Sequence, residues 1–128
     1  MPKKIVKTSK APLPIGPYNQ AVVAGKLVYT AGQIAIDPKT NSVHYGSVGE
    51  QTRIILNNLK VILGAASSSL KKVVKTTVYL KSMDDFVAMN TVYQEYFRDT
   101  KIAPARSTIE VARLPKDVLI EIEAVATI

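Results

Sequence analysis

Arg106 is the residue whose type and position say most about chemistry. It lies in the segment Pro104-Ala105-Arg106-Ser107, at the predicted start of a strand, where a charge that only aids solubility is poorly placed. A guanidinium presents its N–H groups in a planar fork that holds a carboxylate by two parallel hydrogen bonds. Arg106 therefore either binds a carboxylate ligand or forms a structural ion pair with Glu110 or Glu121, and the sequence leaves both interpretations open.

The other candidate residues each have an ordinary structural explanation as well. Glu121 and Glu123 are two positions apart in a predicted strand and so share one face; such a pair serves acid–base catalysis, but more often lies at an interface or in solvent. Tyr18 follows a rigid loop, from which it either holds a ligand or seals the core, and the core is the more common place. His44 lies in a predicted loop without a partner at metal-ligand spacing, which indicates a surface residue.

The composition excludes several kinds of chemistry. The sequence has no cysteine and one histidine, which rules out disulfides, thiolate nucleophiles and cysteine-ligated zinc. A Ser-His-Asp relay within the chain, or a zinc site, would depend on His44 alone. No Gly-Lys-Ser/Thr sequence follows Gly46-Ser47-Val48-Gly49, so this segment is not a phosphate-binding loop.

The net charge of +7 raises the question of a nucleic-acid partner. Two groups of basic residues stand out: Lys3, Lys4, Lys7 and Lys10, then Lys71, Lys72, Lys75 and Lys81. No aromatic stacking motif, zinc-finger spacing or arginine-rich arm accompanies them, so charge that promotes solubility is the more common explanation. Nucleic-acid binding stays open as an alternative.

The first half of the chain is predicted to contain a loop, a hairpin and a helix. Residues 11–17 include three prolines and a glycine, which excludes a helix or a central strand. Strands over 19–24 and 27–31 are expected to meet at a turn formed by Gly25-Lys26. Ser47 and Glu50 have the spacing of a capping box, which predicts a helix start. Its apolar stripe consists of Ile55, Leu59, Ile62, Leu63 and Ala66.

The second half is predicted to add strands and a second helix. Residues 73–80 are β-branched and aromatic, which is typical of a strand buried largely on both faces. Ser82 is expected to cap a helix that ends before Pro104. Two strands with period-two alternation follow, and we expect both helices to cover their aliphatic face. The opposite face, on which we place Arg106 and Glu121, mixes apolar and charged residues, which indicates a subunit interface with polar sites in it.

Six segments in colinear order resemble the RidA/YjgF family over nearly the whole chain. They are Ile15-Gly16-Pro17-Tyr18-Asn19-Gln20-Ala21, Thr30-Ala31-Gly32-Gln33, Val74-Lys75-Thr76-Thr77-Val78-Tyr79-Leu80, Met89-Asn90-Thr91-Val92-Tyr93, Pro104-Ala105-Arg106-Ser107, and Leu114-Pro115-Lys116-Asp117 through Glu121-Ile122-Glu123-Ala124. The resemblance implies an α+β, chorismate-mutase-like fold with a mixed β-sheet and two helices packed on one face. It also implies a homotrimer with a central β-barrel and sites between subunits. Because 128 residues fit one domain, we expect a single domain over residues 1–128.

The activity that this resemblance implies is hydrolysis of reactive 2-imino and enamine acids to 2-keto acids and ammonia, without metal or cofactor. The substrates would be 2-aminoacrylate, 2-iminobutanoate and 2-iminopropanoate. By the same resemblance, Arg106 would bind the substrate carboxylate and Glu121 would orient or deprotonate the attacking water. Tyr18 would line the cleft, Asn90 would hydrogen-bond in its wall, and Gly32 would let the backbone approach the ligand.

Two positions depart from the family pattern. Many members have serine where this chain has Ala31, and cysteine where it has Thr108. Ala31 removes a polar contact from the substrate-binding cleft, which affects substrate preference or rate, whereas the Thr108 hydroxyl can still bond a ligand. Both positions are expected to contribute to substrate binding.

Two other functions remain as alternatives to the deaminase. One is an RNA-acting protein, an endoribonuclease or translation inhibitor, as described for some family members. The other is a non-catalytic, ligand-binding or chaperone-like trimer. The sequence has no apolar run long enough to span a membrane and no signal-peptide pattern, so a cytoplasmic location is the expectation, with the mitochondrial matrix as the alternative.

Overall fold

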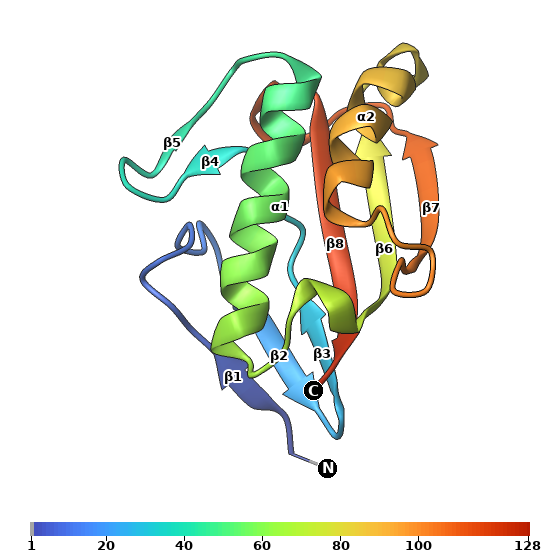
Figure 1. Cartoon of the computed structure of the whole chain (residues 1–128). Helices are drawn as coiled ribbons and strands as arrows, with labels where there is room; N and C mark the ends of the chain where they lie inside the picture. The colour runs from blue at the N-terminus through green and yellow to red at the C-terminus, as the bar shows by residue number, and fades with distance from the viewer. Residues whose placement is uncertain (1) are drawn as a thin grey trace.

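The computed structural model describes residues 2–128; Met1, the first residue of the predicted domain, lies outside the described residues. Its main elements are β1 (Lys4–Val6), β2 (Ala21–Ala24), β3 (Leu27–Thr30), β4 (Ile36–Asp37), β5 (Ser42–Val43), α1 (Val48–Ala65), β6 (Val73–Leu80), α2 (Phe86–Tyr96), β7 (Ala105–Glu110) and β8 (Ile120–Thr127). Figure 1 shows α1 and α2 lying on the same side of a twisted sheet. The α+β class with both helices on one face is therefore confirmed.

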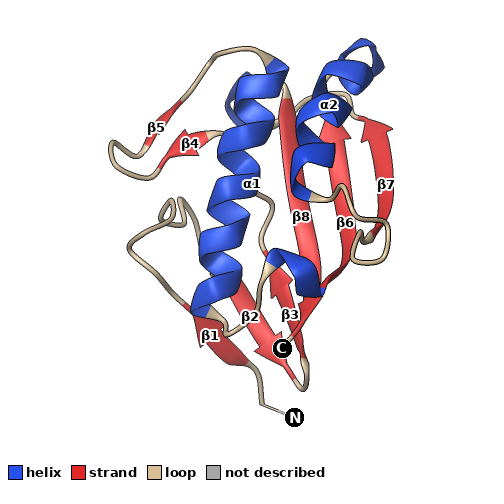
Figure 2. Cartoon of the chain, viewed as in Figure 1, coloured by secondary structure: helices blue, strands red, loops and turns tan. Residues whose placement is uncertain are grey.

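The main sheet has six strands in the order β1-β2-β3-β8-β6-β7, and β4 and β5 form a separate hairpin (Figure 2). All neighbours in the main sheet are antiparallel except β6 and β7, which are parallel and connected through α2. The mixed sheet is as predicted. The long strand β8 lies between β3 and β6, so β7 forms one edge of the sheet and β1 the other.

The predicted hairpin and first helix start are both confirmed. β2 and β3 pair through Ala24 and Leu27, and Gly25 has a φ of 62°, which a residue without Cβ adopts at no steric cost. At the start of α1, the Ser47 side chain accepts the Glu50 N–H and the Glu50 carboxylate accepts the Ser47 N–H, so the capping box is complete.

The second helix begins differently from the prediction. The Ser82 hydroxyl does accept a backbone N–H, from Asp84, but it caps a short 3₁₀ turn over Met83–Asp85. The helix α2 then continues directly from Phe86. Strand β1 was not predicted, because three residues next to a run of lysines give no period-two signal.

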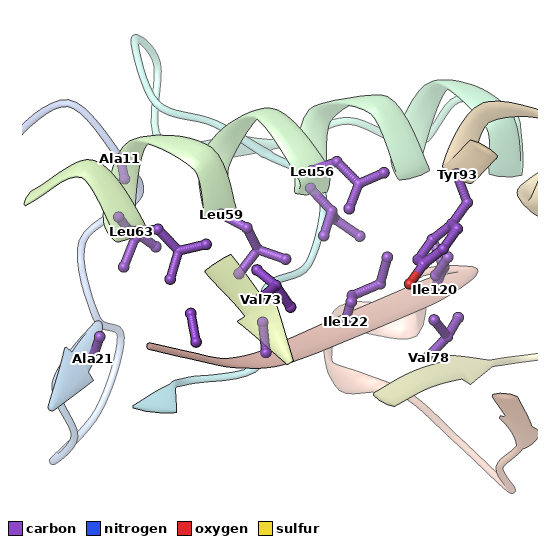
Figure 3. Packing of buried hydrophobic residues seen from close by; sticks show 14 of the residues in the cluster. Ala11, Ala21, Leu56, Leu59, Leu63, Val73, Val78, Tyr93, Ile120 and Ile122 are labelled. Carbon is purple, nitrogen blue, oxygen red and sulfur yellow. The ribbon is translucent and has the colours of Figure 1, made fainter. Parts of the chain in front are cut away.

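The core fills the space between the helices and the sheet (Figure 3). Leu56 and Leu59 of α1 are fully or almost fully buried, as are Ile120 and Ile122 of β8 and Val78 of β6. Burying such a side chain stabilises the fold by about 1.5–3 kcal/mol. The predicted stripe of α1 is the buried stripe.

The sheet face opposite the helices has no covering layer among residues 2–128. Its side chains include Tyr29 and Ile109, each more than two-fifths exposed. The prediction that residues 73–80 are buried on both faces is therefore wrong: buried and less buried residues alternate along β6 from Thr76 to Leu80. The physical reason is that two helices cover only one side of the sheet. No helix among residues 2–128 is long and apolar enough to cross a membrane.

Candidate active site

A cavity of about 370 Å³ opens between the proline-rich loop and the end of β3. Its walls include four of the predicted site residues, Tyr18, Ala31, Gly32 and Glu121. The remaining walls are mostly apolar, from the loop and from the segment that leads into β4: Pro12, Leu13, Pro14, Ile15, Ile34 and Ile36. The structure therefore brings together residues that lie about ninety positions apart in the chain, counting roughly from Ala31 to Glu121, as a folded sheet commonly does.

Gln20 holds the proline-rich loop in place. Its buried side chain accepts the Thr8 N–H at 2.8 Å and donates to the carbonyl oxygens of Thr8 at 3.0 Å and Pro12 at 2.8 Å. A loop with three prolines has few N–H groups with which to form its own hydrogen bonds, so a buried amide replaces them. The residue type alone does not predict this role, although Gln20 lies within one of the segments that carry the family resemblance.

Tyr18 belongs to the cavity and not to the core. Its side chain is largely exposed, and its hydroxyl accepts the Ile15 N–H at 3.2 Å. The ring also lies within ordinary contact distance of Gly16. The interpretation that Tyr18 seals the core is therefore wrong, because the loop carries the ring out beside the cavity.

Glu121 rests directly over Gly32. A Cβ at position 32 would stand 2.0 Å from Glu121 Oε2 and 2.8 Å from Cδ, so only glycine leaves room for this carboxyl. The resemblance implies that Gly32 lets the backbone approach a ligand; in this structure its missing Cβ leaves room for the Glu121 side chain. Burial, and secondly the nearby charge of Glu123, raise the pKa of Glu121 above its ordinary value. A carboxyl with a raised pKa is a stronger base, as acid–base catalysis requires.

Arg106 lies elsewhere, beside α2. Its Nη1 donates to Asn90 Oδ1 at 2.7 Å, and its guanidinium carbon is 4.6 Å from the centre of the Tyr93 ring and 5.5 Å from that of Phe86. The two rings attract the cation and restrict its orientation. Tyr93 is in turn held by a 2.7 Å hydrogen bond between its hydroxyl and that of Thr76. Asn90 thus fixes the arginine directly, a contact that the sequence could not give.

Most of the N–H groups of Arg106 have no hydrogen-bond partner among residues 2–128. A guanidinium carries five N–H groups, and Asn90 is its only hydrogen-bonded side-chain partner among residues 2–128. It takes part in no salt bridge in this part of the chain. The alternative that Arg106 pairs with Glu110 or Glu121 is therefore wrong; Glu110 instead accepts the Met83 N–H.

Thr108 follows Arg106 on the same side of β7. Its Oγ1 is buried and has no hydrogen-bond partner among the described residues. A buried hydroxyl without a partner costs free energy, and such groups in native structures are rare. The Thr108 hydroxyl and the free N–H groups of Arg106 therefore provide hydrogen-bonding capacity on one side of β7.

The predicted placement of Arg106 and Glu121 on one face of the sheet is wrong. In the strand register, Arg106 stands opposite Thr76 and Glu121 stands opposite Tyr79. Thr76 and Tyr79 are three residues apart on β6, so their side chains point to opposite sides. Arg106 lies on the helix-covered side and Glu121 on the uncovered side. Period-two counting gives each strand's alternation but not which set faces the helices.

The structure thus divides the predicted residues into two groups. Arg106, Asn90 and Thr108 form one group at the edge of the sheet beside α2. Tyr18, Ala31, Gly32 and Glu121 form the other group, in the cavity. One group offers a positive charge and donors, and the other offers a carboxyl and apolar walls. Within one chain the two groups do not meet.

Three lysines line a separate open groove of about 410 Å³. Lys71 and Lys72 come from the turn before β6, and Lys101 comes from the loop before β7. Lys75 does not line this groove; its Nζ donates to Ser107 Oγ at 2.9 Å. The single histidine lies apart from both the groove and the cavity: His44 Nε2 and Glu50 Oε2 are 2.8 Å apart on the surface, a contact missed because the two residues are six positions apart.

The chain is similar to known proteins over nearly its whole length. A family model described as Endoribonuclease L-PSP matches residues 8–128. A RutC family protein of Pyrococcus horikoshii is 57% identical over 124 residues, which is 97% of each chain. A 2-iminobutanoate/2-iminopropanoate deaminase of Salmonella typhimurium is 48% identical over 124 residues, or 96% of each chain. The crystal structure of Escherichia coli TdcF with bound serine superimposes with a TM-score of 0.91 at 43% identity, covering 98% of each chain.

Proposed function

The chain belongs to the endoribonuclease L-PSP family, the RidA/YjgF family of the resemblance, and we propose that it hydrolyses 2-imino and enamine acids to 2-keto acids and ammonia. The proposed substrates are 2-aminoacrylate, 2-iminobutanoate and 2-iminopropanoate. Relatives that are 47–48% identical carry the name of this deaminase. TdcF binds serine, a small molecule with the α-carboxylate that these substrates also have.

The observation that carries the proposal is the division of the site into two complementary groups. A guanidinium with free N–H groups lies on one side of the sheet, and a carboxyl over a glycine lies on the other. We propose that the chain forms a homotrimer in which the Arg106 group of one subunit faces the Glu121 cavity of the next. The uncovered sheet face, with its exposed Tyr29 and Ile109, would be buried in the same assembly around a central barrel.

Arg106 would bind the substrate through its carboxylate. Because Asn90 occupies one N–H and two rings restrict the guanidinium plane, the remaining N–H groups are pre-oriented for a bidentate contact. The Thr108 hydroxyl would add a hydrogen bond and so satisfy its own oxygen. Ala31 leaves this part of the cavity wall apolar, which favours substrates with an apolar side chain.

Glu121 would act on the attacking water. The water oxygen bonds to the imine carbon while a proton passes to the Glu121 carboxylate and the π electrons of the C=N bond move to nitrogen. Glu121 then returns the proton to nitrogen, which gives the neutral carbinolamine. Its C–N bond breaks as the hydroxyl proton passes to nitrogen, so that the 2-keto acid and ammonia are released. An enamine substrate first gains a proton on carbon and loses one from nitrogen to become the imine. The raised pKa of Glu121 suits both proton transfers.

The proposal is tested by following release of 2-ketobutyrate when a threonine dehydratase supplies the imine, with semicarbazide trapping as the control for free imine. Arg106→Ala is expected to lower kcat/KM by about 10²–10⁴-fold, since truncating one partner of a hydrogen-bonded charge pair costs about 2–5 kcal/mol. Arg98→Ala removes an exposed arginine and serves as the matched control. An Arg106→Ala protein that assembles normally and keeps the wild-type rate refutes the carboxylate-binding role.

A second candidate function is RNA binding, which the lysine groove favours. Lys71, Lys72 and Lys101 line it without an acidic residue among the lining positions. If RNA is the substrate, neutralising Lys71 and Lys72 abolishes cleavage, and RNA binding weakens steeply with salt. Cleavage that persists in this variant, or that disappears on further purification, removes this candidate.

A further inference from the structure

The two carboxyls of β8 differ in their surroundings although they share one side of the sheet. Glu121 lines the cavity, and none of the side-chain hydrogen bonds among residues 2–128 reaches its carboxyl. Glu123 lies outside the cavity lining and accepts a hydrogen bond from the Tyr79 hydroxyl, with 2.5 Å between Tyr79 Oη and Glu123 Oε1. Tyr79 stands opposite Glu121 in the ladder, so its hydroxyl reaches past Glu121 to the next carboxyl on the same side.

This hydrogen bond distinguishes two otherwise similar groups. A phenol that donates to a carboxylate stabilises the negative charge on that carboxylate. The hydrogen bond to Glu123, followed by burial, raises the pKa of Tyr79 to about 12, so the hydroxyl keeps its proton and remains a donor at all pH values at which a carboxyl titrates. Glu121 has no such donor, and it faces the charge of Glu123 from a half-buried position.

We propose that Tyr79 and Glu123 are positioning residues that make Glu121, and not Glu123, the carboxyl that exchanges a proton with the attacking water. The inference rests on the proposed function of this site and adds two residues to it. Two neighbouring carboxyls resist double ionisation, so the first proton goes to the one whose charge is less stabilised. The Tyr79 hydroxyl decides which one that is, and the fixed charge on Glu123 strengthens the basicity of Glu121.

The other ionisable groups on this side of the sheet do not reverse the effect. Lys81, directly after β6 and two positions from Tyr79, is exposed, and its charge acts on Asp117. Lys75 of β6 is four positions from Tyr79 in the other direction, and its Nζ is engaged with Ser107. Tyr29 of β3 lies opposite Val125, farther along β8 than Glu123. Tyr18 lines the same cavity as Glu121. The charge that raises the pKa of Glu121 is that of Glu123.

The direct test is a titration of the Glu121 carboxyl by carbon-13 NMR in the full-length, assembled protein without substrate. The signal is assigned by its loss in Glu121→Gln. Glu123→Gln is expected to move the Glu121 titration midpoint to lower pH, because it removes the neighbouring charge. Tyr79→Phe is expected to move it in the same direction by less, because the Glu123 carboxylate is then no longer held in place by the phenol and can turn away from Glu121. Tyr29→Phe removes a phenol hydroxyl on the same side of the sheet but opposite Val125, so it is the matched control and leaves the midpoint in place.

The activity profile gives a second measurement. In both Glu123→Gln and Tyr79→Phe, the acid limb of the kcat profile is expected to shift to lower pH together with the Glu121 midpoint, a shift that a purely structural role would not produce. A Glu121 midpoint that stays at its wild-type value in both variants overturns the inference, even if the wild-type enzyme is active. A wild-type protein without deaminase activity refutes the proposed function instead, and the titration distinguishes the two failures.

Discussion

Replacing Gly32 with alanine tests whether the place of Glu121 matters for catalysis. An added Cβ would stand 2.0 Å from Glu121 Oε2, whereas non-bonded heavy atoms normally approach to about 3.5 Å. The carboxyl must therefore move by more than about 1 Å, and displacements of this size cost roughly 10²-fold in rate, with about 10⁴-fold as the limit if the base is lost entirely. This corresponds to about 3–5.5 kcal/mol in the activation free energy.

The same substitution is expected to leave the fold intact. Gly32 is exposed and its φ lies outside the left-handed region, so alanine fits the backbone, and the only clash is with the end of a flexible side chain. The free energy of unfolding should change by less than about 1 kcal/mol. KM should change little, because Arg106 is untouched. Gly64→Ala is the matched control, since no atom lies within 4 Å of its Cβ position; it should stabilise α1 by about 0.5–1 kcal/mol at unchanged kcat.

The assay is the threonine dehydratase-coupled release of 2-ketobutyrate, run on Gly32→Ala, Glu121→Gln and the double variant. Because both changes act on one carboxyl, their effects should not multiply: the kcat of the double variant should lie within about 3-fold of the kcat of the slower single variant. A Gly32→Ala enzyme with the wild-type kcat would refute the reasoning. So would losses that multiply fully in the double variant.

Three further substitutions test the supports of the site. Gln20→Ala should destabilise the fold by about 2–3 kcal/mol and raise KM, because buried partners of the loop lose their hydrogen bonds; denaturant unfolding and kinetics measure the two effects, and unchanged stability contradicts the role of Gln20. Ser47→Ala should lower the free energy of unfolding by about 1 kcal/mol without changing kcat. A larger effect on kcat than on stability would contradict a purely structural role of the capping box. Glu121→Gln should be more stable than the wild type at neutral pH. Because the pKa of Glu121 is raised in the folded protein, the stability of the wild type falls as the pH rises above the ordinary carboxyl value of 4.5, and the variant lacks this loss. Thermal unfolding at pH 4 and at pH 7 should therefore show a stability difference between the two proteins that is larger at pH 7.

Local signals predicted most of the secondary structure. The capping box at Ser47 and the glycine turn at Gly25 are each decided by neighbouring residues, so the sequence alone locates them. The apolar stripe of α1 likewise follows from spacing along one helix. Strand β1 has no such signal, since its place depends on pairing with β2, about fifteen or more residues away along the chain.

The site was predicted only in part, because its geometry depends on which side of each strand faces the helices. Alternation along β7 and β8 was correct, but the face that Arg106 shares with Glu121 was not, since the register between strands is a long-range property. The contact between Asn90 and Arg106 and the fit of Glu121 over Gly32 likewise join distant segments. The resemblance supplied the residues, and the structure supplied their grouping.

The central claim, that one active site is built from two subunits, is tested most directly by mixing two inactive variants. Arg106→Ala and Glu121→Gln are co-expressed with different tags and the mixed assemblies are purified. In a ring of three subunits, every mixed trimer regains one of its three sites, so the purified mixed assemblies should recover about one third of the wild-type activity. A mixture that stays as inactive as either parent, although mixed trimers have formed, would contradict a site shared between subunits.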